Sequence, residues 1–289
     1  MITRNIYKFL NRKVIIRTLC FAVIAFLLYS FIHAFNGVWT DKAEYEQIQK
    51  LRDPRLQMRG LSLYLDDEEI YRFIRVSGGG MFMQDYNTIG LRKDSILTRY
   101  ETINGFILGE IPVPSQLYEY VMTGKNNIEP ESIAWHILPK VQNGISKKEW
   151  MSFIDLLNKK TGHKFRLPSI DEWQYAARGG QASKGYLYAG SNNIDEVAVY
   201  YGNYNKDVGL RCKSKKPNEL GFYDMTGLVD ELTSTPFLEK APEFKHIPEF
   251  DTLNIVAGGP YDTVDLSFFR LYMTRSTGDY TGARLILVE

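Results

Sequence analysis

The chain has 289 residues, of which 44% are hydrophobic, and its formal net charge is +1. This length suffices for one large domain with a hydrophobic core. The near-neutral charge gives no electrostatic reason to expect nucleic acid as a partner. Cys20 and Cys212 are the only cysteines, so the sequence indicates no disulfide framework. The four histidines show no metal-ligand spacing and lie at His33, His136, His163 and His246.

Residues 18–35 form the first predicted element, an apolar run without a formal charge. As a helix this run is about 27 Å long, close to the hydrocarbon thickness of a bilayer. Five basic residues and no acidic residue precede it, whereas acidic residues soon follow it. The positive-inside rule therefore predicts a basic cytoplasmic tail at 1–17, a transmembrane helix at 18–35 and export of the remainder.

Three other interpretations of this run are open. A cleaved signal peptide needs small residues at its cleavage site, and only Ile32-His33-Ala34 comes near that pattern. A lipoprotein needs its cysteine after the apolar run, whereas Cys20 lies near its start. A buried core helix is the third interpretation, and the basic flank and N-terminal position argue against it. An uncleaved anchor fits the sequence best.

Residues 36–69 are predicted to form a stalk between the anchor and an ectodomain at 70–289. Lys42–Leu51 has the composition of a helix, which Asp53-Pro54 should end because proline lacks the backbone donor and clashes with the preceding turn. The stalk carries no residues that suggest chemistry.

The ectodomain begins with predicted strands. Loose alternation indicates a strand at Glu69–Val76, followed by a glycine turn at 78–80 and a short strand at Met81–Met83. A further strand is expected from Ile103 to Ile111. Ser115 should then cap a helix at Gln116–Thr123, which Gly124 closes.

Two helices are marked by capping boxes, in which a serine and a glutamate three residues later satisfy each other's free backbone amides. Ser146 and Glu149 begin the first, and Gly162 ends it. Ser169 and Glu172 begin the second, which the glycines at 179–180 terminate. The apolar residues at helical spacing on their inner faces are Trp150, Phe153, Ile154, Leu157, Trp173, Ala176 and Ala177.

After residue 180, glycine, asparagine and tyrosine dominate, and strands are expected only at Asn254–Ala257 and Ala283–Val288. Long loops around a few helices and strands indicate the α+β class. Because long loops in compact domains are often functional, a site is expected in this C-terminal half.

The segment KFRLPSIDEWQYAARGG at 164–180 is long and specific, and it resembles the most recognisable stretch of the formylglycine-generating enzyme, or sulfatase-modifying factor, family. Further similar segments follow the family's order, at 73–83, 108–122, 217–227, 257–259 and 282–284. The resemblance covers residues 70–289. It implies an irregular α+β fold related to C-type lectins, here preceded by one transmembrane helix.

Oxidases of this family use two cysteines, shortly after the element similar to 257–259, to bind copper and the substrate thiol. A thiolate is the soft ligand that copper(I) requires. The corresponding stretch, 260–270, contains no cysteine, and Cys212 lies outside it. Neither copper nor formylglycine-forming oxidase activity is therefore expected.

The resemblance also implies calcium positions near Asn203 and Glu231. Leu228 stands where the family has an asparagine ligand, so it cannot supply a side-chain oxygen. Calcium needs six to eight oxygens, and these two residues are the candidate ligands that remain. A solvated or hydrogen-bonded Glu231 without metal is the alternative.

Fold-forming motifs are thus retained while the redox site is rewritten, which is typical of a pseudoenzyme. The first hypothesis is a non-catalytic binding or scaffolding ectodomain of the bacterial envelope, motility- or secretion-associated, with envelope proteins as partners. It would be periplasmic and anchored in the inner membrane with a cytoplasmic N-terminus.

The alternative hypothesis is an enzyme with altered chemistry, or a carbohydrate-binding module, in the same cleft. A small polar ligand or glycan would then contact the candidate ligand-binding residues Tyr261, Asp262, Asp265, Arg270, Arg275 and Tyr280. An open cleft lined by these groups favours ligand binding. A filled cleft, with exposed apolar side chains elsewhere, favours a protein partner.

Overall fold

A computed structural model describes residues 50–84, 98–126, 138–240, 245–246, 253–262, 271–274 and 281–289. Residues 53–289 form one compact unit and residues 1–52 another. The predicted transmembrane segment at 18–35 lies outside the described residues. Within the described ranges, no helix has the length and hydropathy needed to cross a bilayer.

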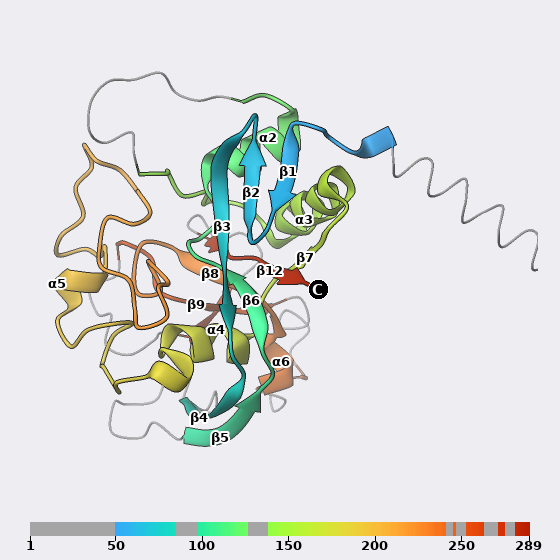
Figure 1. Ribbon diagram of the computed structural model, residues 1–289. Helices are drawn as coiled ribbons and strands as arrows, with labels where there is room; N and C mark the ends of the chain where they lie inside the picture. The colour runs from blue at the N-terminus through green and yellow to red at the C-terminus, as the bar shows by residue number, and fades with distance from the viewer. Residues whose placement is uncertain are drawn as a thin grey trace, which may run out of the picture. The chain divides into compact units, whose positions relative to one another are not determined.

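The compact unit is built on a six-stranded sheet in which every neighbouring pair is antiparallel (Figure 1). Its strands, in spatial order, are β1 (Leu56–Arg59), β2 (Ser62–Leu65), β3 (Glu68–Val76), β6 (Phe106–Gly109), β12 (Ile286–Val288) and β7 (Lys164–Arg166). The C-terminal strand β12 thus lies between β6 and β7, which both come from the middle third of the chain.

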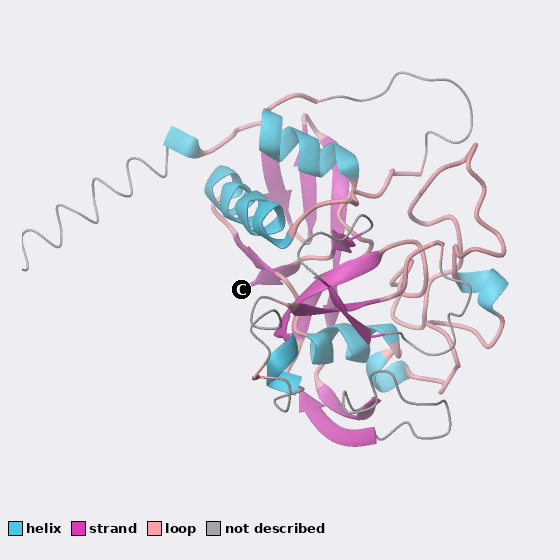
Figure 2. Ribbon diagram, turned by 180° about the vertical axis from the view of Figure 1, so that it is seen from behind, coloured by secondary structure: helices cyan, strands magenta, loops and turns pink. Residues whose placement is uncertain are grey.

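A second sheet of four strands lies beside helix α4 (Figure 2). Its order is β10 (Leu271–Thr274), β9 (Asn254–Ala257), β8 (Asp230–Pro236) and β11 (Thr281–Ala283). β11 pairs with β8 in parallel, and the other pairs are antiparallel. The third sheet is a ribbon of β4 (Gly79–Gln84) and β5 (Thr98–Ile103).

The helices cover two regions of these sheets. α2 (Ser115–Thr123) and α3 (Lys147–Thr161) pack against each other and contact β3 and β1 respectively. α4 (Ile170–Ala177) contacts β4, β5, β8 and β9. The other described helices of this unit are short, namely η4 (Gly180–Ala182), α5 (Ile194–Val197) and α6 (Phe237–Lys240). This mixture of helices, sheets and long loops confirms the predicted α+β class.

The six-stranded sheet separates two hydrophobic cores because successive side chains of a strand point to opposite faces. One core, with α2 and α3, takes from the sheet Phe73, Ile107, Phe165 and Leu287. The other core, with α4, takes Val76, Phe106, Leu108 and Ile286. These strands are therefore apolar on both faces.

The local signals in the sequence position α3 and α4 as predicted. Ser146 and Ser169 are the N-caps of α3 and α4, and both capping boxes are complete. Gly162, in the left-handed conformation, ends α3. The predicted strands at 69–76 and 254–257 are confirmed as β3 and β9.

Several boundaries are corrected. The predicted strand at 103–111 is divided between β5 and β6, and the strand at 283–288 is divided between β11 and β12, which belong to different sheets. Ser115 does not cap α2, because the N-cap is Pro114 and the Ser115 hydroxyl donates to the Val141 carbonyl oxygen at 3.0 Å.

The expected stalk is also too long at its C-terminal end. The compact unit begins at Asp53, and β1 and β2 lie within 36–69. Leu56, Leu63 and Leu65 are buried in the first core. Each strand has only four residues, too few for the alternation to stand out from the charged residues around it.

The outer edge of β7 is closed by a side chain of α3. Asn158 Oδ1 accepts the Phe165 backbone N–H at 2.7 Å, and Asn158 Nδ2 donates to the Phe165 carbonyl oxygen at 3.4 Å. One amide therefore satisfies both backbone groups of a buried residue and ties α3 to the sheet.

We expect Asn158→Ala to lower the free energy of unfolding by about 1–2 kcal/mol, because it leaves these backbone groups without partners. Ser152→Ala, also on α3, removes only a bond to its own helix and should have little effect. Urea unfolding of both variants checks this. Equal stability of the two variants would contradict the assigned role of Asn158.

Candidate functional site

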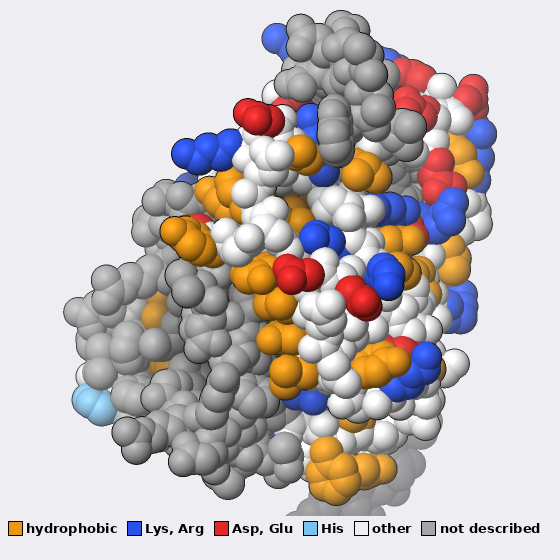
Figure 3. All heavy atoms as spheres, turned by 90° about the vertical axis from the view of Figure 1, so that its left-hand side faces the viewer, with side chains coloured by type: hydrophobic (Ala, Val, Ile, Leu, Met, Phe, Trp, Pro, Cys, Tyr) orange, Lys and Arg blue, Asp and Glu red, His pale blue; other side chains and the backbone are white. Residues whose placement is uncertain are grey.

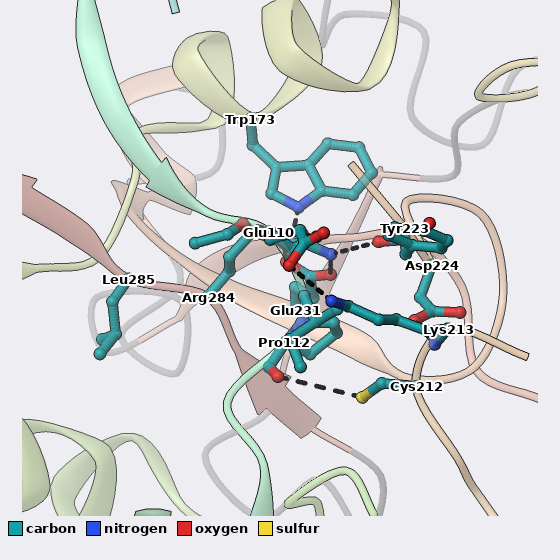
Figure 4. A network of polar contacts seen from close by, with 12 residues as sticks. Glu110, Pro112, Trp173, Cys212, Lys213, Tyr223, Asp224, Glu231, Arg284 and Leu285 are labelled. Carbon is teal, nitrogen blue, oxygen red and sulfur yellow. Dashed lines mark hydrogen bonds and ion pairs between the residues drawn. The ribbon is translucent and has the colours of Figure 1, made fainter. Parts of the chain in front are cut away.

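The centre of the domain is a buried arginine whose five N–H donors are all used (Figure 4). Arg284 donates to both carboxylate oxygens of Glu231, from Nε at 3.0 Å and from Nη2 at 2.8 Å. It also donates to the carbonyl oxygens of Gly109, Glu110 and Tyr223 at 3.0, 2.8 and 2.9 Å. Both charged side chains are fully buried. Burial alone would lower the pKa of Arg284, and the adjacent Glu231 charge outweighs it and raises that pKa.

Glu231 therefore serves as an internal ion-pair partner. Its Oε2 also accepts the Trp173 indole N–H at 2.8 Å, which brings in α4. A calcium ion at Glu231 would have to displace the Arg284 guanidinium from both oxygens. This removes Glu231 from the expected calcium ligands, because its hydrogen-bonded alternative accounts for its position.

Asn203 closes a surface loop. Its Oδ1 accepts the Tyr200 backbone N–H at 3.1 Å, and its Nδ2 donates to the Ala198 carbonyl oxygen at 3.0 Å and to Asp195 Oδ1 at 3.2 Å. No group of three or more His, Cys, Asp or Glu side chains in the described part of the chain is placed to hold a metal ion. Calcium near Asn203 remains a prediction.

A second set of polar groups lies beside the buried pair. Lys213 Nζ donates to Glu110 Oε2 at 2.6 Å, and the Lys213 backbone N–H donates to Asp224 Oδ2 at 2.8 Å. Asp224 is buried, and its Oδ1 has no hydrogen-bond partner among the described residues. Burial raises the pKa of Asp224 to about 6, which the Lys213 N–H only partly offsets.

Cys212 adjoins this cluster. Its side chain is fully buried in the first core, with the sulfur 4.0 Å from the Pro112 carbonyl oxygen. Burial raises the pKa of this thiol well above its ordinary value, so it stays protonated at neutral pH. A buried neutral thiol does not suit the thiolate ligation that copper(I) requires.

Tyr261 and Asp262 follow a tight turn after β9. Gly258 and Gly259 both have positive φ there, and the Gly227 N–H donates to the Gly258 carbonyl oxygen at 2.9 Å. The Tyr261 ring packs against Tyr204, with 4.3 Å between centroids. Asp262 is exposed. The other four candidate ligand-binding residues lie outside the described residues, namely Asp265, Arg270, Arg275 and Tyr280.

Two recesses are lined by other residues. One, of about 490 Å³, lies at the ends of β3, β6 and β12, between Arg75 and Arg166. The other, of about 480 Å³, lies between α3 and β7 and includes Met151 and Leu167. On the face that carries α5, acidic, basic and hydrophobic side chains are interspersed (Figure 3). The described residues on that face form no single-sign patch that would select a strongly charged ligand.

This arrangement supports binding better than bond-breaking chemistry. The buried charges of Arg284 and Glu231 form an ion pair with each other, and the Cys212 thiol is neutral. The sequence analysis missed the pairing of Arg284 with Glu231 and the role of Asp224. A charged residue inside an apolar run, as in Gly282–Leu287, is the signal that could have indicated a buried ion pair.

Because removing one partner leaves an uncompensated buried charge, we expect Glu231→Gln to cost about 3–5 kcal/mol of stability. Glu289→Gln, which breaks the exposed pair with Arg75, should leave the melting temperature close to that of the wild type. The double variant Glu231→Gln/Arg284→Met should lose less stability than the sum of the losses of the two single variants.

Urea unfolding of these variants provides the measurement. If Glu231→Gln does not fold, the comparison of Arg284→Met with the double variant still measures the coupling. Additive effects, or a Glu231→Gln variant as stable as Glu289→Gln, would contradict a structural ion pair.

The raised pKa of Asp224 predicts how the stability of the domain depends on pH. Its folded pKa of about 6 lies above the ordinary value of 3.8, so the folded state binds this proton more tightly than the unfolded state. The stability gained from this protonation is present below pH 3.8 and is lost as the pH rises through about 6. The free energy of unfolding of Asp224→Asn should therefore rise by about 2–3 kcal/mol relative to that of the wild type between pH 4 and pH 7.5.

Thermal or urea unfolding across this pH range tests the expectation. Asp155→Asn, on the exposed side of α3, is the matched control and should follow the wild-type pH profile. A constant stability difference between Asp224→Asn and wild type would show that Asp224 does not titrate in this range.

Comparisons with known proteins agree with this fold. A family model described as the sulfatase-modifying factor enzyme 1-like domain matches residues 65–286. The chain is also similar to the chaperone protein LppX of Paenibacillus barcinonensis, with 30% identity over 182 residues. That alignment covers 48% of this chain and 65% of the relative, so the match spans less than two thirds of the relative's length.

Three solved structures share the fold at low sequence identity. Treponema denticola variable protein 1 has a TM-score of 0.57 and 16% identity, and the match covers 75% of this chain and 95% of that protein. CarF has a TM-score of 0.53 and 18% identity, with coverages of 76% and 98%. PvdO from Pseudomonas aeruginosa has a TM-score of 0.53 and 20% identity, with coverages of 75% and 94%. Because the family model matches most of the chain, this protein belongs to the sulfatase-modifying factor enzyme 1-like family.

Proposed function

We propose that this chain is a non-catalytic member of its family, which works by binding protein partners in the bacterial envelope. The observation that carries the proposal is the state of Cys212, the one cysteine within the compact unit. It is fully buried, and its thiol is held neutral. Cys20 lies in the other unit, so the domain lacks two accessible thiolates for copper-dependent oxidation.

The remaining charges near Cys212 support the same conclusion. The guanidinium of Arg284 forms an ion pair with the carboxylate of Glu231, and Lys213 forms one with Glu110. A general acid or base must reach a substrate proton, and the fully buried Arg284 and Glu231 cannot do so. Besides its exposed charged groups, the described part of the domain exposes large hydrophobic side chains that a protein partner can contact: Phe82, Tyr100, Met151, Leu187 and Tyr201.

A protein-binding role is also consistent with the similarity to a protein named as a chaperone. In this proposal, the apolar run at 18–35 anchors the chain in the inner membrane and the domain lies in the periplasm. The basic residues before the run and the acidic residues after it support that orientation. Anchoring would confine the domain to the membrane surface, where envelope complexes assemble.

A second candidate function is binding of a small polar ligand or glycan. The packed rings of Tyr204 and Tyr261, tilted at 45° to each other, and the exposed carboxylate of Asp262, the next residue in the chain, favour it. An aromatic face can hold the apolar side of a ligand while a carboxylate accepts hydrogen bonds from its hydroxyl groups.

The oxidase question has a direct test. The full-length chain carrying Cys20→Ser should bind copper(I) no more tightly than the Cys20→Ser/Cys212→Ser variant, because the buried thiol is not a ligand. Titration against a coloured copper(I) chelator measures this affinity, and incubation with a cysteine-containing peptide measures turnover. Tight stoichiometric copper(I) binding that needs Cys212, or peptide oxidation, would overturn the proposal.

The partner is tested by cross-linking in native membranes, followed by purification of the chain and identification of bound proteins. The matched control is a chain cut after residue 52, which keeps the N-terminal unit alone. Envelope proteins that are recovered only with residues 53–289 would support scaffolding. Recovery of the same proteins with the control would contradict it, and glycan binding abolished by Tyr261→Ala would favour the second candidate.

A further inference from the structure

Among the strands that the structure describes, β5 is an edge strand of the ribbon that it forms with β4. β4 lies next to η4, where Gln181 Nε2 donates to the Gly80 carbonyl oxygen at 3.4 Å. On the other side of β5, no strand of the described residues is paired. β5 is the outermost strand at the lower end of the domain in both ribbon views (Figures 1 and 2). An edge strand with unpaired backbone groups is a template for pairing with another strand.

This edge carries the most conspicuous pair of exposed rings in the described part of the domain. Phe82 on β4 and Tyr100 on β5 are directly opposite in register. Their centroids are 5.2 Å apart in an edge-to-face arrangement, yet the residues are 63% and 62% exposed. The Tyr100 hydroxyl lies over Gly80, where a Cβ would overlap it. The rings are thus held in place while remaining uncovered by any described residue.

The residues of β5 are complementary to themselves. The segment 98–102 reads Thr-Arg-Tyr-Glu-Thr. If two copies of this segment pair antiparallel about Tyr100, each Arg99 lies opposite a Glu101 and the two Tyr100 residues lie opposite each other. Opposite charges and aromatic pairs are both favourable cross-strand neighbours. A two-fold axis at Tyr100 therefore leaves no like charges opposed.

The charges needed for this pairing already lie on one face. Within the chain, Arg99 forms ion pairs with Glu101 and with Asp171 at the start of α4. The side chain of Glu101 is 39% exposed, so one of its sides is open to solvent. A second copy would add its own Glu101 and Arg99 to this row without burying an unpaired charge.

We propose that the chain forms a symmetric dimer through β5, with the two strands antiparallel and centred on Tyr100. The partner strand at this edge is β5 of a second copy, because in an antiparallel pair centred on Tyr100 the Arg99 of each copy lies opposite the Glu101 of the other. Pairing would place the rings of Phe82, Tyr100 and their two counterparts in one row across a four-stranded sheet. Strand addition of this kind takes its affinity from main-chain hydrogen bonds and its register from side chains. The inference is independent of the proposed function.

The register is tested by cysteine cross-linking of the full-length chain in a mild detergent, in a Cys20→Ser background that leaves only the buried Cys212. Tyr100→Cys should form a disulfide-linked dimer of twice the 33.4 kDa chain mass when diamide oxidises the paired thiols. Tyr201→Cys, at another exposed tyrosine, is the matched control and should cross-link only by collision. Equal cross-linking of the two variants would overturn the proposal.

A charge exchange tests the pairing without a new bond. Arg99→Glu and Glu101→Arg each place like charges opposite one another, so each variant alone should lose the dimer that wild type shows in analytical ultracentrifugation. Their mixture should regain the dimer, because the exchanged charges are complementary. A wild-type chain that stays monomeric at high concentration, or a mixture that does not associate, would contradict the inference.

Circular dichroism identifies variants that fail to fold, since Arg99→Glu also removes the pair with Asp171. In that case the cross-linking comparison decides alone, because Tyr100→Cys keeps both charges.

Discussion

The structure depends on the requirement that a buried guanidinium have a partner for every N–H group. Arg284 meets this requirement with the two oxygens of Glu231 and three backbone carbonyl oxygens. These acceptors come from the end of β6 and the residue after it, the loop at Tyr223, and β8. Arg284 itself lies where the chain leaves β11 in the four-stranded sheet and enters β12 in the six-stranded sheet. One side chain therefore fixes how the two sheets meet.

This constraint explains why a domain with so little regular structure holds together. Loops without a helix or strand pattern must satisfy their backbone groups in other ways. The Tyr223 loop does so through Arg284, and the turn at Gly227 does so through Gly258. The pair between Arg284 and Glu231 is costly to bury, so it contributes more to the choice of one arrangement than to net stability. Its charges are, for the same reason, not available to a ligand.

For function, the consequence is that the polar groups at the centre are paired inside the domain, whereas the groups that a partner can reach lie on the surface. Around the centre, Cys212 is neutral and Lys213 is bound to Glu110. The groups that a binding partner can reach lie outside, on the loops and on the β4–β5 ribbon. The internal polar contacts can thus keep a family fold, while the function of a member must be argued from its own site.

The sequence predicts those parts of the fold whose signals are local. The capping boxes at Ser146 and Ser169 identify α3 and α4, because the reciprocal hydrogen bonds involve residues only three positions apart. The strands β1 and β2 escape prediction because the pairing of β1 with β2 and of β2 with β3, and not their own four-residue pattern, stabilises them. The candidate site escapes for the same reason. Arg284 and Glu231 are 53 residues apart, and the charged residue in the apolar run at 282–287 does not identify Glu231 as its partner.

Hydrogen exchange of the Arg284 side chain tests the central role of this ion pair most directly. The Nε–H of Arg284 should give a resolved NMR signal in nitrogen-labelled protein, assigned by its loss in Arg284→Met. Since this proton is bonded to Glu231 in the centre of the domain, we expect it to exchange only through global unfolding, with the same free energy as the most protected core amides. Fast exchange while the core amides of β6 and β8 stay protected would contradict the view that this pair holds the two sheets together.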